Sequence, residues 1–288
     1  MKNFLPIISI TAGILLPQGH GYAFLIHYFL MIMLFFVFLD TELNRDSITK
    51  THLYILAVNI IVPVFVYYVI HFFDEQLAVI AFVTALAPTA AASTAVIRLL
   101  DGKVEFTIVS VLVTNIAIAV ITPFLLTPIL HSTGEVSFSF ILINVGSVLV
   151  IPLAAAYGVK YFLPAVKKLL SPYKDVPYYL LIINVYLAVA KANDFLSTDT
   201  SAGLGFIINI GIIVLVICVF YFWFGMILGG KNYRLEAGQS LGQKNNSYTV
   251  WLALTFVNPV AAIGPVFYIL YHNMYISYQL YSKNKASA

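Results

Sequence analysis

The hydrophobic positions of this chain fall into ten blocks, separated by short segments that contain charged, glycine or proline residues. Most blocks are about twenty residues long, the length that an α-helix needs to cross about 30 Å of hydrocarbon. Strand-like alternation of apolar and polar residues is absent, so helices rather than a barrel would satisfy the backbone. The pattern predicts membrane spans at residues 4–16, 24–39, 52–73, 76–100, 106–130, 138–163, 176–189, 205–228, 238–257 and 259–281. Because the first and seventh are short, a nine-span or re-entrant arrangement stays open.

The composition agrees with a protein embedded in a membrane. Of the 288 residues, 61% are hydrophobic and 9% are charged, whereas a soluble domain is usually about 25% charged. The single cysteine, Cys218, excludes an intrachain disulfide and a cysteine metal cluster. No loop is long enough to hold a separate domain, and no G-x-S-x-G motif, H-E-x-x-H motif or pair of membrane aspartates is present. We therefore expect one all-α membrane domain over residues 1–288, with no enzyme activity, no nucleic-acid partner and the lipid bilayer as its surroundings.

The basic residues predict how the chain is oriented, because lysine and arginine accumulate in cytoplasmic loops. With the N-terminus inside, 13 of the 15 basic residues fall in cytoplasmic segments. Lys191 falls outside, and Lys244 falls within a span. This segregation predicts ten spans with both termini cytoplasmic, and the short loops favour a bacterial-type inner membrane.

The fourth and ninth spans have the least lipid-like centres. The longest hydrophilic connection, residues 163–177, divides the ten spans into two halves of five, and an odd number of spans makes the second half inverted relative to the first. The fourth span contains Pro88, which removes a backbone donor, and the small residues TAAAST follow it. The ninth contains Lys244 within the run LGQKNNS. Broken helices in corresponding positions of two inverted halves predict a binding site at the membrane midplane. A kinked, closely packed helix at Pro88 and a snorkelling Lys244 are the simpler interpretations.

Lys244 needs a partner, because an ammonium inside a span costs about 2.5 to 3.5 kcal/mol. All twelve acidic residues fall in loops or at span ends, and Glu105 is the nearest carboxylate. We expect hydroxyls, amides and carbonyls of the broken helices to hold the ammonium instead, with these side chains as partners: Ser93, Thr94, Asn245 and Asn246.

These motifs resemble those of the bile acid:sodium symporter family of secondary transporters. The stretch PTAAAST, from Pro88 to Thr94, is similar to the proline and small residues of the family's fourth helix. The stretch SLGQKNNSYTVWLA, from Ser240 to Ala253, is similar to the ninth helix, and Pro265, His272 and Asn273 match the tenth. The glutamate of the family's ninth-helix pattern falls on Ser240, and its glutamine falls on Lys244.

The resemblance implies a ten-helix inverted repeat in which the broken fourth and ninth helices cross. A panel, about residues 4–39 and 138–189, would move against a core, about residues 52–130 and 205–281. The crossing would bind two sodium ions beside the substrate, with Ser93, Thr94 and Thr107 at one ion. On the panel, Asn144, Asn184 and Tyr186 are candidates for substrate contact. Carried over by position, the substrate and ion site comprises Pro88, Ser93, Thr94, Thr107, Ser110, Thr114, Ser240, Gln243, Lys244, Asn245, Asn246, His272 and Asn273.

Lys244 has three candidate roles at this crossing. It would replace one sodium ion and make transport sodium-independent, or it would titrate and couple transport to protons, since burial disfavours the charged form of a lysine. It would also attract an anionic substrate. The sequence therefore predicts a secondary transporter of a small organic anion, such as a bile-acid-like carboxylate or sulfonate, with sodium or a proton as coupling ion and no other cofactor. A sodium-coupled symporter with one remaining sodium site, a channel and a lysine-linked chromophore protein are the alternatives, and the oligomeric state stays open.

Overall fold

The structure is a computed structural model, and it describes residues 5–40, 47–130, 137–173, 175–198 and 203–287. Phe4, the first residue of the first predicted span, lies outside these residues. The same holds for three basic residues that contribute to the predicted orientation, Lys2, Arg45 and Lys174.

The described residues form helices and contain no β-strand, as the hydrophobic pattern predicts. The first part of the chain forms α1 (Leu5–Leu15), the 3-10 helix η2 (Pro17–Tyr22), α2 (Leu25–Asp40), α3 (Lys50–His71), α4 (Glu75–Ala85), α5 (Ala92–Leu99) and α6 (Val104–Leu130). The middle forms α7 (Phe138–Phe162), α8 (Pro164–Leu170), η5 (Ser171–Tyr173) and α9 (Val176–Thr198). The last part forms α10 (Leu204–Gly229), α11 (Arg234–Gly242), α12 (Asn246–Leu252), the π-helical turn η6 (Ala253–Val257), η7 (Pro259–Ala262) and α13 (Ile263–Ser287).

Five of these helices, α3, α6, α7, α9 and α10, are long and apolar enough to cross a membrane. Shorter apolar helices cover Leu5–Leu15, Leu25–Leu39 and Glu75–Ala85. The seventh predicted span is longer than expected, because α9 continues to Thr198. Lys191 and Asp194, which mark the end of the apolar run in the sequence, lie one turn apart on this helix with their charged atoms 3.9 Å apart. A helix tolerates such a pair, so the prediction of an end at residue 189 is wrong.

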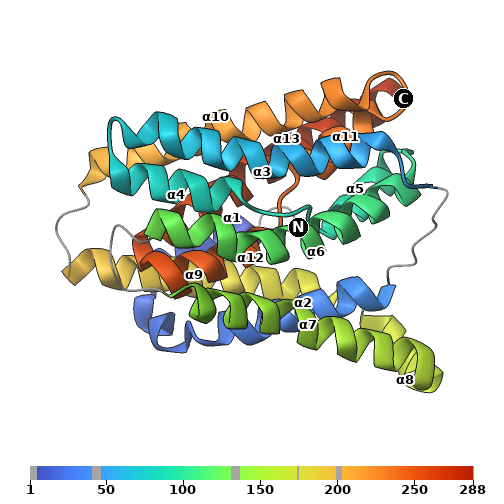
Figure 1. Ribbon diagram of the computed structural model, residues 1–288, viewed down its shortest axis with the longest axis horizontal. Helices are drawn as coiled ribbons and strands as arrows, with labels where there is room; N and C mark the ends of the chain where they lie inside the picture. Colours follow the sequence, from blue (N-terminus) through green and yellow to red (C-terminus); the bar gives the residue numbers. More distant parts are fainter. Residues whose placement is uncertain (1–4, 41–46, 131–136, 174, 199–202, 288) are drawn as a thin grey trace.

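Two groups of helices pack side by side (Figure 1). In one, α1 packs on α9, and α2 packs on α7 and α9. In the other, α3 packs on α4 and α6, and α10 packs on α11 and α13. Whether these groups move against each other as a panel and a core stays a prediction.

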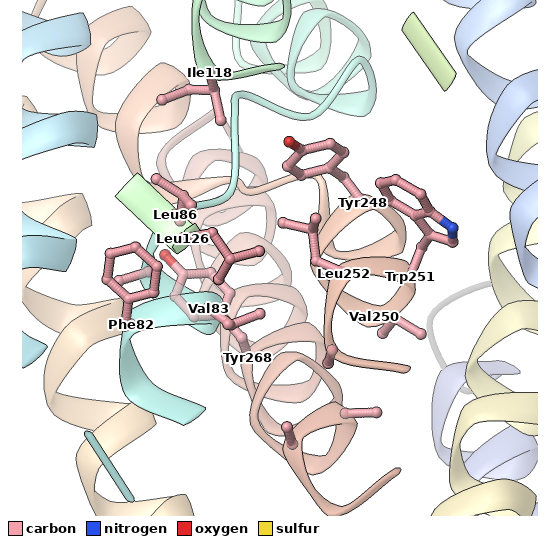
Figure 2. Packing of buried hydrophobic residues seen from close by; sticks show 14 of the residues in the cluster. Phe82, Val83, Leu86, Ile118, Leu126, Tyr248, Val250, Trp251, Leu252 and Tyr268 are labelled. Atoms are coloured by element: carbon pink, nitrogen blue, oxygen red, sulfur yellow. The ribbon is translucent and has the colours of Figure 1, made fainter. Parts of the chain in front are cut away.

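The helices of the second group approach closely where glycines face each other. A Cβ atom on Gly225 of α10 would lie 2.6 Å from the carbonyl oxygen of Ala237 and 2.9 Å from the Cα atom of Gly238. Backbones of α10 and α11 therefore touch, which small residues permit in membrane bundles. Apolar side chains fill the space between α4, α6, α12 and α13, as Figure 2 shows for Phe82, Leu126 and Leu252.

Candidate site at the break of two helices

The two predicted interruptions lie side by side and complete each other's hydrogen bonding. Between α4 and α5 the chain is extended at Thr89, and between α11 and α12 it is extended at Lys244. These two residues form an isolated antiparallel bridge. The amide of Ala90 donates to the carbonyl of Gln243, and the amide of Asn245 donates to the carbonyl of Pro88, each at 2.8 Å.

This pairing follows from the local sequence. Pro88 lacks an amide proton and disfavours helix in the residue before it, so α4 ends at Ala85. Helix ends leave amides and carbonyls without partners, and an unpaired backbone group is costly inside a membrane. Because two helices break at the same place, each extended segment satisfies groups of the other. The sequence prediction of interruptions in these two helices is confirmed.

The Thr89 side chain and side chains from two neighbouring helices hold the bridge in place. The hydroxyl of Thr89 donates to the carbonyl of Ser240 at 2.6 Å. From α6, Thr114 accepts from the amide of Thr89 at 3.0 Å, and Asn115 donates to the carbonyl of Thr89 at 2.9 Å. From α13, the hydroxyl of Tyr268 donates to the carbonyl of Gly242 at 2.8 Å. The crossing is therefore fixed to α6 and α13 by buried hydrogen bonds.

Lys244 is enclosed, with 1% of its surface exposed. Its ammonium donates a hydrogen bond to the side-chain oxygen of Asn59 on α3. It also lies 3.7 Å from the centre of the Tyr221 ring on α10, which is a cation–π contact. Among the described residues, no acidic side chain forms an ion pair with it. This burial contradicts the interpretation of Lys244 as a snorkelling side chain.

The partners predicted for Lys244 are wrong. Ser93 and Thr94 donate to carbonyls one turn earlier in the chain, those of Ala90 and Ala91. Asn245 and Asn246 point elsewhere: Asn245 donates to the side chain of Asn115 at 3.4 Å, and Asn246 donates to the carbonyl of Lys244 at 3.1 Å. Short polar side chains reach nearby backbone first, whereas the long lysine side chain reaches across to two other helices.

Several other predicted site residues surround the crossing. His272 on α13 is buried, and its Nδ1 lies 3.4 Å from the amide nitrogen of Asn246. Asn273, by contrast, donates to the carbonyl of Ile269 in its own helix at 2.7 Å. Within the described part of the chain, five residues predicted for the crossing carry a buried side-chain oxygen without a hydrogen-bond partner: Thr107, Ser110, Ser240, Gln243 and Asn246.

The panel residues that are candidates for substrate contact have contacts within the protein. The hydroxyl of Tyr186 donates to the carbonyl of Leu16 at 3.0 Å, which ties α9 to the end of α1. Asn144 donates to the carbonyl of Phe140 in its own helix at 2.8 Å. Asn184 is buried, and its amide lies 3.9 Å from the sulfur of Met33.

Sequence reasoning missed four residues of the crossing: Asn59, Thr89, Asn115 and Tyr221. The signal for Asn59 and Asn115 was a lone amide in an otherwise apolar part of α3 or α6, since polar groups inside a membrane tend to have a specific partner. Thr89 belongs to the recognised motif after Pro88. Nothing in the sequence distinguishes Tyr221 from the other aromatic residues of its helix.

Comparison with known proteins identifies a family. The family model described as "Sodium Bile acid symporter family" matches residues 24–199, more than half of the chain. The curated proteins contain no match. The members of the matching family are transporters rather than enzymes. With its several apolar helices and this match, the chain is a multi-pass membrane protein that belongs to the sodium bile acid symporter family.

Proposed function

We propose that this protein is a secondary active transporter of a small organic anion, and that Lys244 takes the place of a mobile coupling ion at the helix crossing. The observation that carries the proposal is the enclosed ammonium, bound to Asn59 and to the face of Tyr221. The family supports the transporter class. Anion selectivity, alternating access and the coupling mode belong to the proposal.

The proposed architecture is a ten-helix inverted repeat with a core and a panel. The positions of the two broken helices support it, because α4 with α5 forms the fourth predicted span and α11 with α12 forms the ninth. The two breaks meet in an antiparallel pair, which is the arrangement expected of equivalent breaks in two inverted halves. We also propose a cell inner membrane with both termini cytoplasmic, on the segregation of the basic residues.

The contacts of Lys244 favour a fixed cation over direct binding of an anionic substrate. The side chain leaves the break between α11 and α12 and reaches α3 and α10, so one charge joins three elements. With 1% of its surface exposed, it offers little access to an anionic substrate. A free cation within about 4 Å of the ammonium would be repelled by about 4 kcal/mol at an effective dielectric constant of 20. Sodium and the ammonium therefore exclude each other from this place.

Uptake by purified protein in liposomes tests the proposal. A panel of radiolabelled bile acids and small carboxylates supplies the probe, and external sodium is replaced by choline while pH is varied separately. We expect saturable uptake by the wild type that does not require sodium, and loss of that uptake in Lys244→Gln. Strict sodium dependence of the wild type that survives in Lys244→Gln would overturn the proposal. Channel-like currents would contradict a carrier.

A second candidate is a symporter that keeps one sodium site. The observation that favours it is the pair of buried hydroxyls on α6, Thr107 and Ser110, that have no hydrogen-bond partner among the described residues. The same uptake assay separates the two candidates. Sodium-dependent uptake that is lost in the isosteric variant Thr107→Val, but kept in Lys244→Gln, would establish the symporter.

A further inference from the structure

An apolar groove of about 320 Å³ runs along the outside of the protein between α10 and α13. Its floor includes Cys218 and Phe222, which are buried, and its rims include Val219, Trp223 and Met274, which are exposed. Its size falls at the lower end of the range for ligand pockets, about 300 to 1,000 Å³. The remaining lining residues are Leu215, Met226, Tyr271 and Tyr275.

The groove follows the axis of α10 over the depth of one leaflet. Lining residues recur every three or four positions from Leu215 to Met226, which places them on one face of the helix. This distance is about 16 Å at the rise of an α-helix, close to half of the roughly 30 Å hydrocarbon core. Met226 lies within one turn of Gly229, where α10 ends. The groove therefore extends from near the middle of the bilayer to one of its surfaces.

Two cations stand at the surface end of the groove. Lys231 and Arg234 follow the end of α10, and both are exposed. Arg234 packs against that end, because a Cβ atom on Gly229 would lie 2.9 Å from its backbone. At the same end, the hydroxyl of Tyr275, which lines the groove, lies 3.9 Å from the sulfur of Met226. Positive charge thus flanks the surface end of the apolar groove.

We propose that this groove binds one acyl chain of an anionic phospholipid, whose phosphate group contacts Arg234 and Lys231. An acyl chain matches the apolar lining and its length of one leaflet, and an anionic headgroup matches the two cations. Basic residues at a membrane surface attract anionic lipids. The site lies on the outer face of α10 and α13 and does not depend on the proposed transport function.

Tryptophan fluorescence tests the site directly, because the chain has two tryptophans in different surroundings. Trp223 on the groove rim is 55% exposed, whereas Trp251 is 3% exposed. In a Trp251→Phe background, Trp223 reports on the groove. The protein is reconstituted in vesicles that contain phosphatidylcholine and phosphatidylglycerol, with bromine on the acyl chains of one or the other lipid, since brominated chains quench a neighbouring tryptophan.

We expect brominated phosphatidylglycerol to quench Trp223 at roughly 25-fold lower mole fraction than brominated phosphatidylcholine, since each of the two basic residues contributes about 1 kcal/mol. The preference should fall by roughly fivefold for each basic residue removed, in Arg234→Gln and in Lys231→Gln. Lys168→Gln is the matched control: it removes one exposed charge from α8, which does not pack on α10 or α13, and should leave the preference unchanged.

Equal quenching by the two lipids, or a preference that survives in the double variant, would overturn the proposal. Quenching that falls as the ratio of protein to lipid rises would assign the groove to a second copy of the chain instead. If Trp251→Phe does not fold, native mass spectrometry of the wild type and Arg234→Gln gives the same answer. Retention of phosphatidylglycerol by the wild type should then exceed retention by the variant, and equal retention would refute the site.

Discussion

Replacing Asn59 by leucine is the sharpest perturbation of the crossing. Asn59 accepts the only hydrogen bond that the described residues provide for the ammonium of Lys244, and both side chains are almost fully buried. A hydrogen bond to a charged group contributes about 1.5 to 3 kcal/mol. Complete burial places this one at the upper end of that range.

The Tyr221 ring limits the loss of stability in this variant. It lies 3.7 Å from the ammonium, and a desolvated cation–π contact contributes about 2 kcal/mol, which Asn59→Leu should leave in place. The loss of folding free energy should therefore stay below the roughly 3 to 5 kcal/mol that follows when a buried ion pair is broken. We expect Asn59→Leu to lower the free energy of unfolding by about 2 to 3 kcal/mol. At roughly 2 to 4 °C for each kcal/mol, the melting temperature should fall by about 4 to 12 °C.

A double-mutant cycle isolates the interaction from the other effects of each substitution. In a Lys244→Met background no charge is left to satisfy, so Asn59→Leu should be nearly neutral. Denaturant unfolding in mixed micelles, followed by far-UV circular dichroism, measures the four corners of the cycle. Asn144→Leu is the control, because Asn144 donates only within its own helix, and it should change stability little.

Equal destabilisation of the Lys244→Met protein and of the wild type by Asn59→Leu would refute this prediction. Such additivity would mean that the two side chains do not share a charge-assisted hydrogen bond.

Three further substitutions test the packing and hydrogen bonding between the helices. Gly264→Ala would place a Cβ atom against the hydroxyl of Thr84, and overpacking of this kind costs about 1 to 3 kcal/mol. Gly158→Ala on α7 would place a Cβ atom that meets nothing within 4 Å, so it should stabilise the protein by about 0.5 to 1 kcal/mol. Thermal unfolding of the two variants should therefore show shifts of opposite sign in the melting temperature. Tyr248→Phe removes a hydroxyl that lies 2.8 Å from the hydroxyl of Thr122, and it should lower the free energy of unfolding by about 1 kcal/mol. A wild-type melting temperature in this variant would show that the contact between α12 and α6 does not contribute to stability.

Much of the helical organisation could be predicted because its causes are local. The length of each apolar run is set by the thickness of the bilayer, so α3 and α10 begin and end within a few residues of the predicted limits. The break at Pro88 was also predictable, since proline lacks an amide proton wherever it stands. The far end of α9 was not, because Lys191 and Asp194 resemble the start of a loop until their pairing on the helix is known.

The sequence by itself therefore determined that this is a helical membrane protein, that two of its helices are interrupted, and that a lysine in one interruption needs a partner. Only the tertiary structure decided which partner. Asn59 is separated from Lys244 by 185 positions in the chain, and Tyr221 is one of 19 tyrosines. The cost of a buried charge follows from its residue type alone, whereas the groups that offset the cost depend on which helices pack around it.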